Sequence, residues 1–307
     1  MVATEFQLID HFFAGIGDSS SVLLGIGDDA AALELPAGHV LLVSTDTVSE
    51  GVHFPRGTHA VDVAYRAVIA AASDLAAMSA EPLGMLLALT LARTDSEWLA
   101  GFATGLREAA AITQLPLVGG DTTQGALTVS ITVLGSAPRA TYLTRQSAQP
   151  GDRLCVSGTL GDAAAGLSIR LGETVADDQS ALFLTDRFTR PSARLALGQL
   201  LRGHATSAID ISDGLLADAG HLARCSGVAL EVDSAALPLS EAMQTIADEA
   251  QQLNWALGGG DDYELLFTLP ADATLPSGCT EIGRVRSGSG VFCDVMPEQT
   301  GYEHFVR

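Results

Sequence analysis

The feature that most constrains this fold is a junction that recurs along the chain, in which an apolar stretch meets an aspartate flanked by small residues. It first occurs at Gly25-Ile26-Gly27-Asp28-Asp29-Ala30, directly after Val22-Leu23-Leu24. It returns around Asp46, Asp74, Asp121, Asp210, Asp213 and Asp261. Carboxylates repel one another and are costly to bury without partners. The repetition therefore predicts that several of these aspartates converge on one cation-filled site.

Length and composition favour a folded protein of two domains. The 307 residues are 47% hydrophobic and 17% charged, which excludes a mainly disordered chain. No apolar run approaches the roughly 20 residues that cross a bilayer, and the beginning of the sequence lacks the basic segment of a signal peptide. We expect a cytoplasmic protein without a membrane partner.

The charge balance narrows the function classes. A net charge of −21 argues against an extended nucleic-acid footprint. The chain contains Arg but no Lys, which excludes a Schiff-base lysine and the lysine of a Walker A loop. Phosphate chemistry in this chain would need metal ions, Arg and backbone N–H groups. Four dispersed cysteines without metal-ligand spacing disfavour zinc: Cys155, Cys225, Cys279 and Cys293.

The first part of the chain predicts an α+β domain over residues 1–137, with a mixed sheet and helices on one face. Periodicity and turn signals place its strands at 22–35, 40–43, 83–91, 115–118 and 126–136. The expected helices are 5–13, one capped by Asp62 and ending near residue 80, and one capped by Ser96 and ending near residue 114.

Residues 138–307 predict an α/β domain, arranged as a sandwich, that completes the active site. Its strands are expected at 153–156, 208–211, 228–232, 263–269, 281–285 and 290–295. Its helices are expected at 163–171, 191–203, from an Asp213 N-cap to Cys225, and 240–257.

Each candidate aspartate has a structural alternative. Asp74 lies in a nearly apolar helix, where it is a metal ligand, the partner of an Arg such as Arg66, or a residue at an exposed position. Asp46 shares a face with Ser44 if their strand continues, or else forms an Asx turn. Asp121 follows two glycines that would let a phosphate approach the backbone, but Gly-Gly is also a turn signal.

The combined set favours Mg²⁺ and phosphoryl transfer. Mg²⁺ prefers oxygen ligands, keeps some of its waters and bridges carboxylates to phosphates. In phosphoryl transfer the protein mainly positions groups and neutralises charge. We recognise no nucleophile of a catalytic triad, so direct in-line transfer fits better than a phospho-enzyme.

Six ordered motifs together resemble the thiamine-monophosphate kinase family, which belongs to the ATP-binding superfamily of aminoimidazole ribonucleotide synthetase. The resemblance spans nearly the whole chain. Its motifs are Gly25–Asp29, Ser44–Thr47 with His53-Phe54, Ser73–Met78, Gly119–Thr123, Ala208–Leu215 and Gly260–Leu265.

The resemblance implies transfer of the ATP γ-phosphoryl group to thiamine monophosphate, giving thiamine diphosphate, in a homodimer whose N-terminal sheets pair. It implies Mg²⁺ ligation by Asp29, Ser44, Thr45, Asp46, Asp74, Asp121, Asp210 and Asp213, of which Asp74, Asp121 and Asp210 would be catalytic. ATP contacts would come from Gly120, Asp121, Arg145 and Ser212, and thiamine phosphate contacts from His53, Asp261 and Tyr302.

Two positions depart from the family pattern. Asp261 stands where Glu is more usual, and a nucleotide-contacting Tyr has no counterpart in Phe102-Ala103-Thr104-Gly105. The alternatives are another ATP-dependent enzyme of the superfamily and a non-catalytic protein that binds cations or nucleotides. A selenophosphate synthetase is disfavoured because no Cys or Lys lies in the N-terminal region.

Overall fold

The computed structural model describes residues 5–17 and 19–305. The chain divides into two compact units, Met1–Leu75 with Ala80–Ala140 and Ala76–Ser79 with Thr141–Arg307. Each unit combines helices with a β-sheet, so the predicted fold class is confirmed. No helix of the described residues is long and apolar enough to span a bilayer.

The first unit is built on a sheet with the strand order β3-β6-β4-β5. These strands are β3 (His39–Ser49), β6 (Thr128–Pro138), β4 (Glu81–Leu91) and β5 (Leu117–Gln124). β4 and β5 run parallel, whereas the pairs β3–β6 and β4–β6 are antiparallel. The sheet is therefore mixed, as the sequence predicts.

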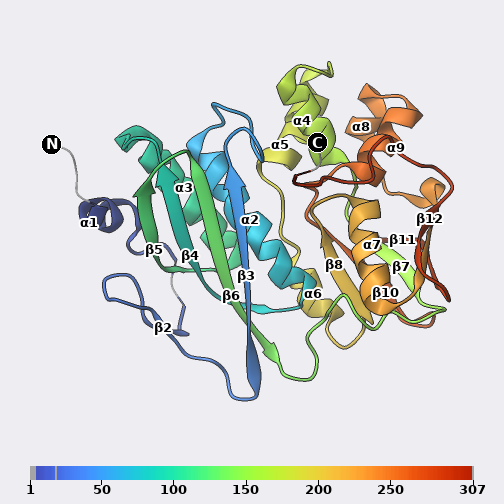
Figure 1. Ribbon diagram of the computed structural model, residues 1–307, viewed down its shortest axis with the longest axis horizontal. Helices are drawn as coiled ribbons and strands as arrows, with labels where there is room; N and C mark the ends of the chain where they lie inside the picture. The colour runs from blue at the N-terminus through green and yellow to red at the C-terminus, as the bar shows by residue number, and fades with distance from the viewer. Residues whose placement is uncertain (1–4, 18, 306–307) are drawn as a thin grey trace. The chain divides into compact units, whose positions relative to one another are not determined.

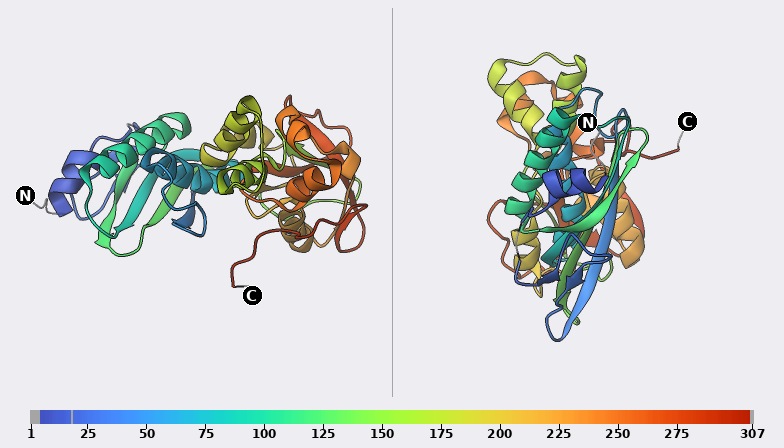
Figure 2. Two further views of the ribbon diagram at one scale, coloured as in Figure 1. Left: turned by 90° about the horizontal axis from the view of Figure 1, so that it is seen from above. Right: turned by 90° about the vertical axis from the view of Figure 1, so that its left-hand side faces the viewer.

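Helices α2 (Ala60–Ala77) and α3 (Ser96–Thr113) lie on one face of this sheet (Figures 1 and 2). Two predicted helix starts are wrong. Asp62 lies in the first turn of α2, not before it. Asp95, not Ser96, caps α3, because its carboxylate accepts the backbone N–H groups of Glu97 and Trp98.

β3 and β5 are longer than predicted, and this changes where two of the aspartate motifs lie. The polar residues Ser44 to Asp46 continue β3, and Asp121 lies within β5. Conversely, the predicted strand 22–35 is wrong, because only β1 (Val22–Leu24) and β2 (Ala32–Leu33) are extended and paired. The segment before them is α1 (Glu5–Leu8) continued by a π-helical turn, η1 (Ile9–Phe13).

The second unit contains a sheet with the order β12-β9-β11-β7-β10-β8. Its strands are β7 (Arg153–Ser157), β8 (Ser207–Ile211), β9 (Ala229–Val232), β10 (Glu264–Leu269), β11 (Cys279–Arg286) and β12 (Gly290–Cys293). β12 runs parallel to β9, and the other pairs are antiparallel.

Helix α7 (Leu215–Ser226) packs on this sheet and buries Leu215, Ala219 and Leu222 against its strands (Figure 1). The remaining helical elements are α4 (Asp162–Leu171), α5 (Asp178–Thr189), α6 (Leu195–Leu201), α8 (Glu241–Ile246), α9 (Glu249–Gly258) and the 3₁₀ turn η2 (Ser234–Ala236).

The predicted helix 240–257 is wrong, because it is broken into α8 and α9. Asp248 caps α9 by accepting the N–H of Gln251. The predicted helix 191–203 is also shorter, being α6, and α5 falls in a stretch without a predicted element. Asp213 is not the N-cap of α7; Gly214 occupies that position, with no side-chain hydrogen bond of its own.

Candidate functional site

Ser44 and Asp74 meet within the first unit, where the Ser44 hydroxyl donates a hydrogen bond to a carboxylate oxygen of Asp74. Asp46 lies two residues along β3 from Ser44 and therefore on the same face of the strand. Asp74 lies in the last turn of α2, and this turn contains no basic residue. The helix dipole disfavours a carboxylate there, so a cation bound beside Asp74 would stabilise this arrangement.

Thr45 points to the opposite face of β3, where its hydroxyl hydrogen-bonds that of Thr132 at 2.7 Å. Its side chain therefore does not join Ser44 and Asp46. Asp121 shares a face of β5 with Thr123, whose hydroxyl hydrogen-bonds that of Thr90 on β4 at 3.1 Å.

Asp121 also lies away from Asp46 along the sheet. β5 is three strand positions from β3, a separation of about 14 Å at the usual strand spacing. The chain as described does not bring these two carboxylates to one ion. The neighbouring Gly120 is required by packing, because a Cβ there would come within 1.9 Å of the Leu87 carbonyl oxygen.

The two adjacent aspartates of the first motif differ in role. Asp28 accepts the backbone N–H of Asp29 at 2.8 Å and so serves the turn. Asp29 has an exposed side chain. Gly27 has φ +122°, a conformation that favours glycine, although open space surrounds its Cβ position.

His53 lies in the turn that follows β3 and is oriented by the backbone of Ser49, the last residue of that strand. Its Nδ1 accepts the N–H of Ser49 at 3.1 Å. A neutral imidazole with an accepting Nδ1 carries its proton on Nε2. His53 can therefore donate a hydrogen bond through Nε2 to an anionic ligand.

Among residues 5–17 and 19–305, no group of three or more His, Cys, Asp or Glu side chains lies close enough together to hold a metal ion. The Ser44 hydroxyl and the Asp74 carboxylate, which are hydrogen-bonded to each other, offer oxygen ligands of the kind that Mg²⁺ prefers. Mg²⁺ commonly takes one or two carboxylates and completes its shell with water and substrate phosphates. The Ser44, Asp46 and Asp74 set fits that kind of site and not an all-protein cage.

In the second unit the central element is the loop Ser212-Asp213-Gly214 between β8 and α7. Asp218, one turn into α7, is 3% exposed. One of its carboxylate oxygens accepts the backbone N–H groups of Ser212, Asp213 and Gly214, each at 3.1 Å. These three amides already have Asp218 as their acceptor, so an ATP contact by Ser212 would need its side chain or its carbonyl group.

The same loop joins two residues that lie far apart in sequence. The carbonyl oxygen of Ser212 accepts the N–H of Asp261 at 2.9 Å, and that of Asp213 accepts the N–H of Tyr302 at 2.9 Å. The Tyr263 hydroxyl donates to the Asp261 carboxylate at 3.1 Å. Four predicted site residues, Ser212, Asp213, Asp261 and Tyr302, are thus brought together by main-chain bonds.

The remaining predicted residues of the second unit differ in exposure. Asp210 is buried within β8, whereas Arg145 is exposed. Burial raises the pKa of the Asp213 carboxyl, and nearby His221, His304 and Arg145 oppose the rise. Burial also raises the pKa of Asp218 to about 7, with the charge of Asp213 adding to the effect.

Asp262 and Glu264, which follow Asp261, take part in buried hydrogen bonds and ion pairs that the sequence does not predict. Asp262 accepts the N–H groups of Gly161 at 2.6 Å and Ala163 at 3.2 Å, at the start of α4. Glu264 is fully buried and is ion-paired with Arg187 at 3.0 Å and with Arg194. In the sequence, the only indication of this network is the presence of three acidic residues in the motif Gly-Gly-Asp-Asp-Tyr-Glu.

Asp261 and Tyr263 flank Asp262 with φ values of +71° and +51°. Left-handed conformations are uncommon for residues with side chains and persist where the surrounding structure enforces them. The buried bonds of Asp262 supply that enforcement and fix the segment that carries Asp261.

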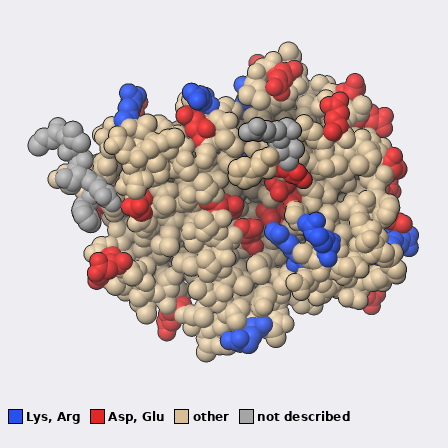
Figure 3. All heavy atoms as spheres, in the orientation of Figure 1, with Lys and Arg blue, Asp and Glu red and all other residues tan. Residues whose placement is uncertain are grey.

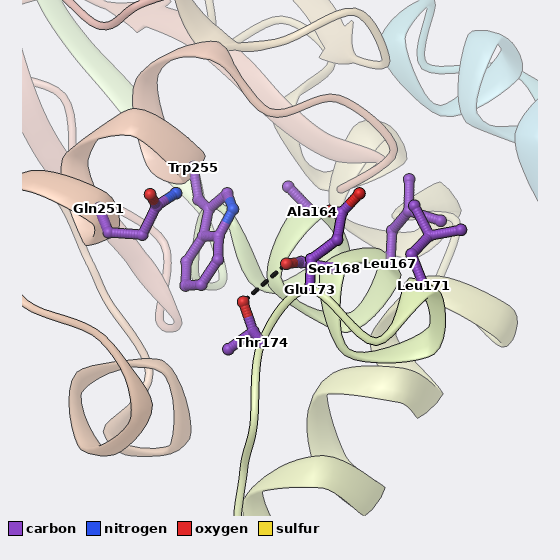
Figure 4. Close-up of a pocket in the computed structure, with 8 residues that line it drawn as sticks. All are labelled: Ala164, Leu167, Ser168, Leu171, Glu173, Thr174, Gln251 and Trp255. Carbon is purple, nitrogen blue, oxygen red and sulfur yellow. Dashed lines mark hydrogen bonds between the residues drawn. The ribbon is translucent and has the colours of Figure 1, made fainter.

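A pocket of about 360 Å³ lies elsewhere in the second unit, between α4 and α9 (Figure 4). Trp255, Leu167 and Leu171 supply apolar lining, and Ser168 and Thr174 bond each other across 2.7 Å. It contains none of the predicted site residues. Acidic side chains occur at many places on the visible surface (Figure 3).

Family models place the chain within a known class. Residues 27–137 match the N-terminal domain of AIR synthase related proteins, and residues 149–295 match the C-terminal domain of the same proteins. The chain is therefore an AIR synthase related protein. Within that class it belongs to the thiamine-monophosphate kinase family, as the following relatives establish.

The chain is 44% identical to the thiamine-monophosphate kinase of Escherichia coli strain K12 over 272 residues, which cover 88% of this chain and 84% of that protein. It is 41% identical to the enzyme of the same name from Salmonella typhimurium, over 100% and 99% of the two chains.

Among solved structures, the thiamine-monophosphate kinase of Stenotrophomonas maltophilia matches with a TM-score of 0.84 and 42% identity, over 90% of this chain and 92% of that one. A structure of AaThiL complexed with AMPPCP and TMP matches with a TM-score of 0.83 and 37% identity, over 91% and 92%.

Proposed function

We propose that this protein phosphorylates thiamine monophosphate to thiamine diphosphate, with ATP as the phosphoryl donor. The observation that carries the proposal is the match, over nearly the full length, to proteins named thiamine-monophosphate kinase. The similar AaThiL structure binds AMPPCP, an analogue of ATP, together with TMP, which supports the same two substrates here.

The first domain, residues 1–137, is proposed to bind Mg²⁺ and the nucleotide. Asp29, Asp46, Asp74 and Asp121 would be metal ligands, with the Ser44 hydroxyl and the Thr45 backbone beside them. Metal binding by Asp46 and Asp74 is supported by the hydrogen bond between Ser44 and Asp74 and by the strand face that Ser44 shares with Asp46. The separation of Asp121 from Asp46 favours different ions for these two residues.

The second domain, residues 138–307, would contribute Asp210 and Asp213 as metal ligands and Arg145 and Ser212 as ATP contacts. Thiamine phosphate would be bound by Asp261 and Tyr302 of this domain and by His53 of the first. The hydrogen bond from the Ser49 N–H to Nδ1 supports the part of His53, because it directs the proton of a neutral imidazole to Nε2, the atom that would donate to a phosphate oxygen.

Direct transfer fits these residues. Mg²⁺, when bound, neutralises the charge that two phosphate anions bring together. The acceptor is itself a phosphate and is ionised near neutral pH, so it needs little help from a general base. Arg145 is exposed and can contact anionic oxygens, while His53 orients the acceptor through a hydrogen bond.

A homodimer is proposed, with the uncovered face of the first unit's sheet as the interface. On β3, Leu41 is 50% and Val43 56% exposed on the face opposite to Leu42 and Val48. Leu134 pairs with Val43 and continues the apolar surface onto β6. We further propose that the protein acts in the cytoplasm, where ATP is available.

The deciding experiment incubates the purified chain with ATP, Mg²⁺ and thiamine monophosphate and follows thiamine diphosphate and ADP by chromatography. One thiamine diphosphate per ADP is expected. ADP without thiamine diphosphate would indicate another acceptor, and no turnover with Mg²⁺ or Mn²⁺ would overturn the proposal. Thiamine in place of its monophosphate is the matched control, and it should not react.

A further inference from the structure

Asp218 is a buried carboxylate that the proposed reaction does not use directly. It lies on α7, and its Oδ2 atom receives three consecutive backbone N–H groups, from Ser212, Asp213 and Gly214. A buried amide without an acceptor is costly. Asp218 therefore holds this loop in one conformation through the backbone N–H groups of the loop.

The carbonyl side of the loop carries the two segments that would contact thiamine phosphate. Ser212 accepts the N–H of Asp261, and Asp213 accepts the N–H of Tyr302. The Asp213 side chain projects from the same loop as a proposed metal ligand. A rotation of these peptide groups would move Asp213, Asp261 and Tyr302 together.

Close packing leaves the loop little room to adjust. A Cβ on Gly260 would lie 2.4 Å from the Ser212 oxygen, and one on Gly301 would lie 3.1 Å from the Asp213 oxygen. Gly214 has φ +131°, and its Cβ position is 2.8 Å from the Gly258 oxygen. The segments before Asp261 and Tyr302 therefore sit directly against the loop.

We propose that Asp218 is a positioning residue that sets Asp213 for the metal-bound nucleotide and Asp261 and Tyr302 for thiamine phosphate through the loop Ser212-Asp213-Gly214. This role rests on the proposed function. It couples the two substrates, because a single side chain orders the contacts to both. Asp218 itself touches neither substrate.

The test compares Asp218→Ala, which leaves three amides without their acceptor, with Asp218→Asn, which keeps an acceptor oxygen and nearly the same volume. Partners that orient ligands typically contribute about 10- to 100-fold to affinity or activity. We expect the Ala variant to raise KM for thiamine monophosphate and the Mg²⁺ concentration for half-maximal rate by factors in that range. The Asn variant should recover part of both.

Asp152→Asn is the matched control. Asp152 is also a buried carboxylate of the second unit, and it accepts the N–H of Gln149 and the hydroxyl of Thr206, away from the loop. It should reduce stability without changing KM for thiamine monophosphate. If Asp218→Ala only lowers stability, as Asp152→Asn does, and leaves KM and the Mg²⁺ dependence unchanged, the positioning role is wrong.

Hydrogen exchange separates this inference from the proposed function. In Asp218→Ala the backbone amides of Asp261 and Tyr302 should exchange faster than in the wild-type protein, although these amides bond Ser212 and Asp213 and not Asp218. This readout needs no turnover. If the wild-type protein makes no thiamine diphosphate, the proposed function fails, while unchanged exchange at Asp261 and Tyr302 would overturn the coupling through the loop.

Discussion

The aspartates that look alike in the sequence have different physical roles in the structure. Asp28, Asp218 and Asp262 accept backbone N–H groups and hold turns or helix starts. Asp74 receives only a hydroxyl from Ser44 among the bonds described for it, at a helix end whose dipole is unfavourable to an anion. An aspartate placed in this way is suited to bind a cation.

Asp74→Asn should abolish most turnover and leave the fold intact, because the amide keeps the size of the side chain but removes the charge that would hold Mg²⁺. Since a partner that only orients a ligand contributes about 10- to 100-fold, loss of a ligand should reduce kcat/KM by at least about 100-fold. Steady-state kinetics and circular dichroism measure the two effects.

Asp62→Asn, in the first turn of the same helix, is the control for Asp74→Asn and should retain activity. Equal activity of Asp74→Asn and the wild-type enzyme at limiting Mg²⁺ would contradict a metal role for Asp74.

Asp262 should contribute to the pH dependence of the free energy of unfolding. Burial raises its pKa from 3.8 to about 8 in the folded protein, against the opposing charge of Arg187. Between these values the folded state keeps a proton that the unfolded state has lost. The free energy of unfolding should therefore fall as the pH rises from about 4 to 8, with a contribution of at most about 1.4 kcal/mol per pH unit from this group.

Asp262→Asn should remove that contribution, because an amide does not titrate. Urea unfolding of both proteins at several pH values measures the difference. A wild-type stability that rises over this range relative to the variant would show that Asp262 is ionised in the folded protein.

Sequence motifs name the candidate residues of the proposed site, but they do not reveal which side chains and backbone groups those residues bond. The Ser44–Asp46 motif indicates oxygen ligands, and alternation in a strand separates Thr45 from both neighbours. Nothing in the Ala208–Leu215 motif indicates that Asp218 holds the loop Ser212-Asp213-Gly214. The available signal is the spacing, since Gly214 and Asp218 are four residues apart and lie on one side of a helix turn.

At the level of elements, the sequence predicts the helices and strands well where periodicity is strong and less well at their ends. α2 and α3 are long and were expected. The break between α8 and α9 was missed because apolar residues continue across it, although Asp248 three residues before Gln251 resembles a capping box. α5 was missed as well, despite Asp177 acting as its N-cap.

The cap of α3 offers a test at this scale. Asp95→Ala should lower the free energy of unfolding by about 1 kcal/mol, because the N–H groups of Glu97 and Trp98 lose their acceptor. Ser96→Ala should have a much smaller effect, since Ser96 is already helical. Denaturant unfolding of both variants decides between the two positions, and the opposite order would identify Ser96 as the cap.

At the scale of the whole molecule, one face of the sheet β3-β6-β4-β5 is not covered by helices of the described residues, and the question is what covers it. A sheet packs one face on its helices and must expose or pair the other. Here the exposed face carries Leu41 and Val43 at its edge strand, with hydroxyl residues such as Thr45 and Thr47 further along. A contiguous apolar patch at the surface commonly marks an interface.

The proposed dimer predicts that a charge placed on this patch separates the protomers. In Val43→Glu each protomer would bring a carboxylate into the apolar interface, and burying a charge without a partner is costly. We expect wild-type protein to sediment as a dimer and Val43→Glu as a monomer at the same concentration.

Val175→Glu is the control for the dimer, since Val175 is 90% exposed on the second unit and lies outside the sheet. It should leave the mass unchanged. If Val43→Glu remains dimeric, the sheet face is not the interface; if the wild-type protein is monomeric at all concentrations, the proposed dimer is wrong. Activity measured on the same samples then tells whether turnover depends on the assembled state, because a reaction that needs only one protomer would survive dissociation with kcat unchanged.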